Sequence, residues 1–141
     1  MKKILIINSN YYKEISENLV FNAKKKLLDV RYKVSILNVP GAFEIPIAIR
    51  KNINNFNGFV ALGCVIKGQT PHFDLLCSSL FNSILSLSIN YNKPIGNGVI
   101  TALNLSQAKQ RCKKSNVKLP NKGSEAAIAV ISILKNGPKK I

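Results

Sequence analysis

Acidic residues are scarce in this chain. Its 141 residues include six Asp and Glu against 21 Lys and Arg, so the formal net charge is +15 at pH 7. Such a charge attracts polyanions and anionic small molecules, but it does not determine a fold. Nucleic-acid-binding surfaces interleave aromatic with basic residues, and this pattern is missing here. Because Lys and Asn are plentiful along the whole chain, we attribute the charge to general composition and expect no specific nucleic-acid binding.

Cysteine is also rare. The three cysteines, Cys64, Cys77 and Cys112, are an odd number and form no CxxC pair, which argues against a disulfide framework or a zinc cluster. The first eight residues have an apolar core of only four residues with no small-residue cleavage site after it. We therefore interpret them as a strand, not a secretion signal, and expect a cytoplasmic protein.

Several familiar motifs are absent as well. The sequence has no glycine-rich phosphate loop, no nucleophile elbow and no cluster of metal ligands. It has no internal repeat and no linker, and its length suits one domain of residues 1–141. Residues 75–92 carry no charge, but serine and asparagine interrupt the apolar residues. This segment is therefore not predicted to span a membrane.

The sequence does contain alternating strand and helix patterns. Apolar runs at residues 4–8, 32–39, 59–66 and 94–101 predict four strands. Helical spacing predicts helices at 13–29, 44–51 and 75–92, and Ser106 and Ser124 are expected to cap two more. This alternation predicts an α/β fold, a three-layer sandwich with a four-stranded parallel sheet and right-handed crossovers.

The segment around residues 75–92 has two different faces. One is an apolar stripe, and the other is small and uncharged. A solvent-facing surface normally carries Lys and Glu, so the second face favours burial against a partner. The stripe comprises Phe73, Leu76, Cys77, Leu80, Phe81 and Ile84.

The only histidine, His72, follows the third predicted strand. Ligands of open α/β sheets bind beyond the carboxyl ends of the strands. Thr70 can cap the next helix with Pro71 as its first residue, which places His72 in the first turn. Free amides there form an anion seat, and the positive helix end favours neutral imidazole, a proton acceptor. The alternative is a histidine that only fills a surface turn. These residues alone indicate a phosphate-handling α/β enzyme.

Three stretches together resemble the lumazine synthase family: "VPGAFEIP" (39–46), "ALGCVIKGQTPHFD" (61–74) and "NKGSEAA" (121–127). Their order and spacing match the family over nearly the whole chain. The resemblance implies a flavodoxin-like fold and a transferase of riboflavin biosynthesis. The enzyme condenses 5-amino-6-(D-ribitylamino)uracil with 3,4-dihydroxy-2-butanone 4-phosphate, giving 6,7-dimethyl-8-ribityllumazine, water and phosphate. It also implies that no metal or organic cofactor takes part.

The same resemblance implies residues that contact the pyrimidine and the ribityl chain. Tyr11 would stack on the pyrimidine, and Glu44 would accept hydrogen bonds from ribityl hydroxyls. Asn97 stands where the family usually has a phenylalanine against the pyrimidine, which is a departure. The implied set is Tyr11, Ala42, Phe43, Glu44, the backbone of Cys64, Val65 and Ile66, and Asn97.

For the phosphate and the proton transfers, the resemblance implies five further residues. Gln69 and Thr70 would hold the butanone phosphate, Arg111 would pair with it and Lys122 would support it. His72 would move protons. The stretch between residues 111 and 121 is a few residues longer than usual, which affects the register of Lys122.

The resemblance also implies a site shared between the subunits of a pentamer, with Asn97, Arg111 and Lys122 supplied by the adjacent chain. The sequence starts almost at the first predicted strand, without the amino-terminal segment that commonly adds an edge strand to a neighbour's sheet. We therefore expect a free pentamer and not a sixty-subunit shell.

Three other functions fit parts of the sequence. An archaeal-type riboflavin synthase shares this scaffold but dismutates two lumazines. A non-catalytic flavin or lumazine binder is suggested by Asn97, and a nucleic-acid-binding module by the charge.

Overall fold

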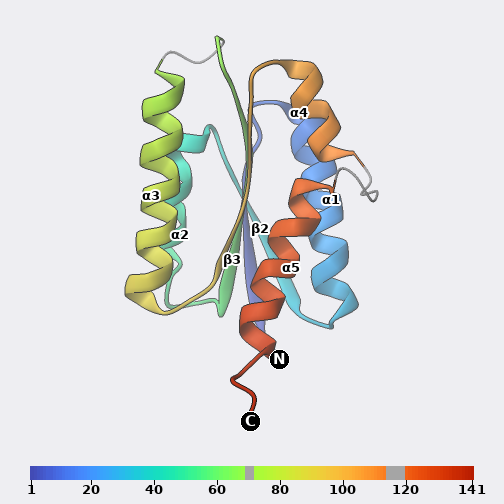
Figure 1. Ribbon diagram of the computed structural model, residues 1–141, viewed down its shortest axis with the longest axis vertical. Helices are drawn as coiled ribbons and strands as arrows, with labels where there is room; N and C mark the ends of the chain where they lie inside the picture. The colour runs from blue at the N-terminus through green and yellow to red at the C-terminus, as the bar shows by residue number, and fades with distance from the viewer. Residues whose placement is uncertain (69–71, 114–119) are drawn as a thin grey trace.

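The computed structural model describes residues 1–68, 72–113 and 120–141, and its centre is a parallel sheet of four strands (Figure 1). Strand β3 (Gly58–Ile66) is buried along its whole length because it lies inside the sheet. Strands β2 and β4 form the two edges, so each has one side without a partner strand in this chain. The order across the sheet is β2 (Lys33–Val39), β1 (Lys3–Ser9), β3 and β4 (Ile95–Ala102).

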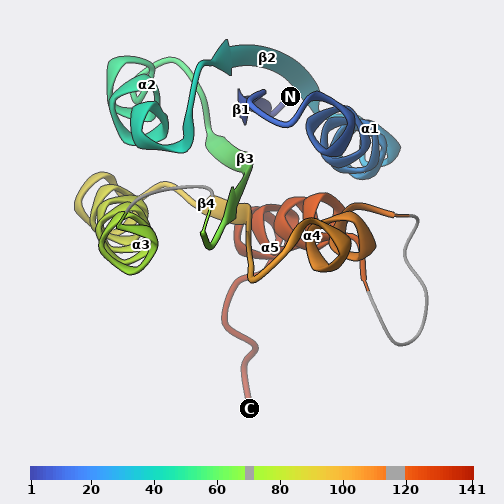
Figure 2. The same cartoon turned by 90° about the horizontal axis from the view of Figure 1, so that it is seen from above.

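Helices cover both faces of the sheet, which confirms the predicted three-layer, flavodoxin-like α/β sandwich (Figure 2). One face carries α2 (Ile45–Lys51), α3 (Phe73–Tyr91) and a short 3-10 turn, η1 (Ala42–Glu44). The other face carries α1 (Lys13–Asp29), α4 (Leu105–Cys112) and α5 (Lys122–Lys135).

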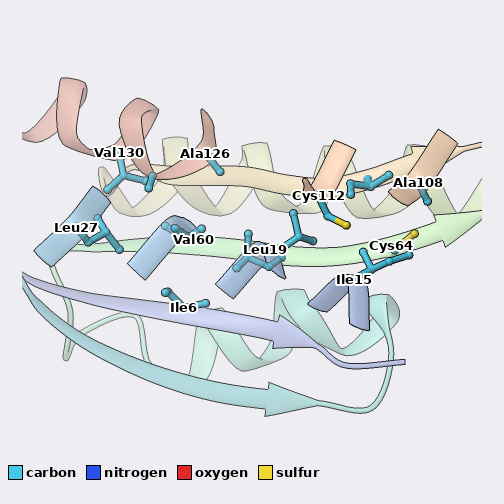
Figure 3. Close-up of a cluster of buried hydrophobic side chains, with 14 of the residues drawn as sticks. Ile6, Ile15, Leu19, Leu27, Val60, Cys64, Ala108, Cys112, Ala126 and Val130 are labelled. Atoms are coloured by element: carbon cyan, nitrogen blue, oxygen red, sulfur yellow. The ribbon is translucent and has the colours of Figure 1, made fainter. Parts of the chain in front are cut away.

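The alternation of side chains along the strands divides the core in two. Ile4, Ile6 and Val60 pack under α1 and α5 in the cluster that Figure 3 shows, whereas Leu5 and Phe59 pack under α2 and α3. Consecutive residues of a strand point to opposite faces, so one short apolar run supplies both halves of the core.

Helix α5 lies unusually close to strand β4. A Cβ atom at Gly96 would lie 2.2 Å from the carbonyl oxygen of Ala126. Only glycine leaves room for the helix backbone at this distance, so Gly96 sets how closely the helix that carries Lys122 packs on the sheet.

The helix starts differ from the prediction at three places. Asn104 caps α4 and Asn121 caps α5, each accepting a hydrogen bond from the backbone N–H three residues later. Ser106 and Ser124 therefore lie inside the first turns, because asparagine at the preceding polar position already supplies the capping oxygen. His72 precedes α3 instead of belonging to its first turn, because its backbone is left-handed (φ 60°, ψ 39°).

Helix α3 has the length and hydropathy of a membrane-spanning helix. Its predicted apolar stripe nevertheless packs on the sheet: Leu80 and Ile84 are buried, and Phe73 and Phe81 are partly buried beside them. A single helix of this length and composition that packs on a sheet is not sufficient evidence for a membrane span, and we assign none.

Candidate active site

The first group of predicted site residues follows the carboxyl ends of the strands. Tyr11 comes shortly after the end of β1, and it is 72% exposed. Its ring meets that of Tyr12 edge-on, with the ring centroids 4.9 Å apart. The η1 turn follows β2, and His72 lies between the end of β3 and the start of α3. Parallel strands end at one edge of the sheet, so the topology brings these segments to the same end of the molecule.

The η1 turn presents one buried and one exposed side chain. Ala42 is buried, whereas Phe43 is 74% exposed at the wall of a cavity of about 380 Å³. The carboxylate of Glu44 lies over Gly41. A Cβ atom added at Gly41 would be 3.1 Å from Oε1 of Glu44. The cavity lies between this turn and the two helices of its face, and its lining comprises Phe43, Glu44, Pro46, Ile47, Leu76, Ser79, Leu80 and Ser83.

The end of β3 extends beyond its neighbour β1. Pairing between the two strands reaches Leu62, whereas pairing with β4 continues to Ile66. The backbone of residues 64–66 therefore has a ladder partner on only one side, a suitable arrangement for hydrogen bonds to a planar ligand. The side chains of Cys64, Val65 and Ile66 are buried.

The thiol of Cys64 is chemically quiet. Burial raises its pKa to about 12, and nearby Cys112 adds to the shift. The group stays protonated at physiological pH and is not a nucleophile. Any contact that Cys64 makes with a ligand therefore involves its backbone.

His72 is exposed at the N-cap position of α3. Its carbonyl oxygen accepts a hydrogen bond of 2.9 Å from the backbone N–H of Leu76, which starts the helix. The imidazole is thus presented at the start of a 19-residue helix. Gln69 and Thr70, the predicted phosphate contacts next to it, lie outside the described residues.

The second group lies at the open edge of β4. Asn97, Arg111 and Lys122 line one cavity of about 130 Å³, although they come from β4, α4 and α5. Its volume corresponds to roughly four water molecules. The other lining residues are Phe81, Val99, Ile100 and Thr101.

A hydrogen-bonded asparagine joins the two helices that carry the cations. The fully buried Asn121 donates from Nδ2 to the carbonyl oxygens of Cys112 (2.7 Å) and Lys113 (2.9 Å). Its Oδ1 accepts from the N–H of Ser124 (3.0 Å). These bonds fix the end of α4 against the start of α5, and so hold Arg111 near Lys122 despite the longer connection between them.

The sequence did not predict a role in the site for two residues of this region. Phe81 was assigned only to the apolar stripe of α3, and Asn121 only to a motif. The "N-K-G-S" pattern, an asparagine three residues before a helical N–H, is the signal that could have identified Asn121 as a cap. For Phe81, a position within the apolar stripe gave no sign that it borders a polar cavity.

No residue lines both the cavity beside Phe43 and the cavity beside Arg111. Of the predicted site residues, Phe43 and Glu44 line the first cavity, and Asn97, Arg111 and Lys122 line the second. In the described part of the chain, no three or more His, Cys, Asp and Glu side chains form a cluster that could hold a metal ion.

Comparison with known proteins identifies the family. The 6,7-dimethyl-8-ribityllumazine synthase family matches residues 1–136. The chain belongs to the lumazine synthase family. A 6,7-dimethyl-8-ribityllumazine synthase of Erythrobacter litoralis is 37% identical over 137 residues, covering 96% of this chain and 95% of the relative. That of Novosphingobium aromaticivorans is 36% identical over 136 residues (95% of each chain), and that of Afipia carboxidovorans is 36% identical over 140 residues (94% of this chain and 84% of the relative).

The match to the lumazine synthase family includes every residue of both groups, from Tyr11 to Lys122.

Proposed function

We propose that this chain, as one domain of residues 1–141, is a transferase that condenses 5-amino-6-(D-ribitylamino)uracil with 3,4-dihydroxy-2-butanone 4-phosphate. The products are 6,7-dimethyl-8-ribityllumazine, inorganic phosphate and water. Family membership over residues 1–136 is the observation that carries this conclusion. No finding favours a riboflavin synthase or a non-catalytic binder.

The first group of residues binds the pyrimidine substrate in this proposal. The exposed ring of Tyr11 is free to stack on the heterocycle, and the one-sided backbone of residues 64–66 hydrogen-bonds its edge. Glu44 accepts hydrogen bonds from ribityl hydroxyls, while Ala42 and Phe43 give this pocket its apolar wall.

Arg111 and Lys122 of the second group handle the phosphate, whereas Asn97 faces the pyrimidine. Arg111 and Lys122 supply two cations at one cavity, with Gln69 and Thr70 as further contacts. Imine formation, loss of phosphate and ring closure each require proton transfers and a stabilised leaving group, and otherwise depend on positioning. His72 is the group that accepts and returns the protons.

We further propose a cytoplasmic homopentamer in which each site lies between two chains. The separation of the two groups supports this arrangement, because one chain does not join them in a common cavity. The outer face of α3 supports it as well: Leu75, Leu85 and Ile89 are 68%, 59% and 69% exposed in the single chain. Apolar side chains in such a row are covered in a ring of subunits.

The test is to incubate the purified protein with both substrates and to follow lumazine absorbance and phosphate release together. We expect one phosphate per lumazine, and no product when the butanone phosphate is left out. Product formed from lumazine alone would instead identify a riboflavin synthase, and binding without turnover would identify a binder.

A further inference from the structure

Phe81 lines the cavity that holds Asn97, Arg111 and Lys122. Its ring is partly buried against the core beneath α3 and partly open. Of the residues lining this cavity, Phe81 alone is aromatic. An aromatic face here is therefore supplied by helix α3, not by strand β4.

Asn97 and Phe81 approach the cavity from the same side of the sheet. Asn97 alternates with Val99 along β4, and Val99 packs in the cluster under α3 together with Leu80 and Ile84. Because side chains two apart on a strand share a face, Asn97 also points to the α3 face. The ring and the amide are thus neighbours at the open edge of the sheet.

The amide of Asn97 is held in one orientation. Its Oδ1 accepts a hydrogen bond of 3.1 Å from the backbone N–H of Val99. The Nδ2 group then remains as a donor at the cavity. An asparagine held in this way lacks an aromatic ring, but it can donate to a carbonyl oxygen.

We propose that Phe81 forms the aromatic wall against the pyrimidine in this protein, and that Asn97 donates from Nδ2 to a carbonyl group of the same ring. The inference rests on the proposed function. It assigns the stacking role, which the family places at position 97, to a residue on another element. The uracil ring suits this pair because it has a flat π-face for Phe81 and carbonyl acceptors for Asn97.

Stacking of a base on an aromatic side chain gives a predictable effect. In Phe81→Leu, the KM for the pyrimidine substrate should rise about 5- to 150-fold, the range expected when such stacking is lost. The KM for the butanone phosphate should change by less than about twofold, since Arg111 and Lys122 are untouched.

The matched control is Phe21→Leu, which removes an equally large ring that is 67% exposed on α1, away from this cavity. It should leave both KM values unchanged. The thermal unfolding midpoint of every variant shows whether a change in KM reflects loss of folding, because Phe81 also packs on the core.

A double variant separates stacking from structure. Asn97→Phe placed in the Phe81→Leu background restores an aromatic ring to the same cavity from the strand, and should recover most of the lost pyrimidine affinity. No recovery, or an equal rise of both KM values in Phe81→Leu, would overturn the assignment. Failure of the proposed function itself would appear differently, as an absence of lumazine formation by the wild-type protein.

Discussion

At the scale of single residues, His72 combines an exposed imidazole with a backbone that few residue types accept. Its φ of 60° lies in the left-handed region, where non-glycine residues are strained and asparagine is among the best tolerated. A substitution at this position therefore affects both the imidazole and the left-handed backbone. A replacement chosen only to remove the imidazole would also disturb the start of α3.

His72→Asn tests the chemistry with least damage to the backbone. We expect the rate of lumazine formation to fall about 10- to 1000-fold, since general acid–base groups contribute about that much. The unfolding midpoint should stay close to that of the wild type, whereas His72→Ala should lower it because alanine is strained at this φ. A folded His72→Asn protein with an unchanged rate would remove His72 from the mechanism.

Arg111 is predicted to discriminate between the two substrates. Its loss in Arg111→Ala should weaken use of the butanone phosphate by about one to two decades, the value of a charge-assisted hydrogen bond to phosphate. The pyrimidine should be affected far less. Steady-state kinetics with each substrate varied in turn measures both effects.

The control for Arg111 is Lys109→Ala. It removes the same charge from the same exposed helix, α4, but Lys109 does not line the cavity. It should leave both KM values nearly unchanged. Equal losses for the two substrates in Arg111→Ala would contradict the phosphate assignment.

At the scale of elements, the helices and strands could be predicted because their patterns are local. The helix at 13–29 is found with the predicted bounds, and the four strands differ from prediction by one or two residues. The caps at Asn104 and Asn121 were missed because serine and asparagine compete for the same role, and only the backbone conformation decides between them.

Less of the candidate site than of the fold could be predicted from the sequence. Spacing alone indicated residues near the strand ends, and the family resemblance named their roles. Neither could show that Asn97, Arg111 and Lys122 meet at one cavity, because three elements have to pack first. Phe81 shows the same limit. Helical periodicity places it on the apolar face of its helix, but it does not show that Phe81 borders the cavity beside Arg111.

The connection between α4 and α5 depends on Asn121. Asn121→Ala should destabilise the fold by about 2–4 kcal/mol, because it removes the helix cap and leaves two buried carbonyl groups without a donor. Asn121→Asp keeps the capping oxygen but places a carboxylate against two carbonyl oxygens in a fully buried position, so its loss of stability should be at least as large. Chemical denaturation gives the free energies of unfolding, and Ser124→Ala, which leaves the cap intact, is the control.

At the scale of the whole molecule, several acidic side chains lie at the starts of helices and several basic side chains at their ends. Glu14, Asp74 and Glu125 lie in the first turns of helices, whereas Lys26, Arg50 and Lys135 lie in last turns. This distribution complements the helix dipoles. Lys3 and Lys33 lie opposite each other in the register of β1 and β2, at the amino ends of these strands. These positive charges lie away from the carboxyl ends of the strands.

Nucleic-acid binding should accordingly be weak and independent of sequence. We expect binding to duplex and single-stranded probes at low salt to fall steeply with added salt, as counterion release predicts. A titration of labelled probes between low and physiological salt measures this. Sequence-selective binding that persists at physiological salt would contradict the attribution of the charge to composition.

The assembly is the remaining question at this scale. Light scattering at moderate salt should give a mass of about 78 kDa, five times the 15.5 kDa of the chain. The uncovered apolar residues of α3 provide the reason, since a monomer would leave them in water. A sixty-subunit particle would overturn the choice of a free pentamer but not the shared site.

If each site is divided between two chains, mixing two impaired variants should restore activity. His72→Asn and Arg111→Ala proteins are unfolded, refolded together in equal amounts and assayed for lumazine formation. In a ring with random mixing, about one quarter of the interfaces combine an intact His72 with an intact Arg111 of the neighbour. We predict that activity rises to about one quarter of the wild-type value. If each chain formed its own complete site, no mixture could restore one, and activity at the level of the separate variants would contradict the account.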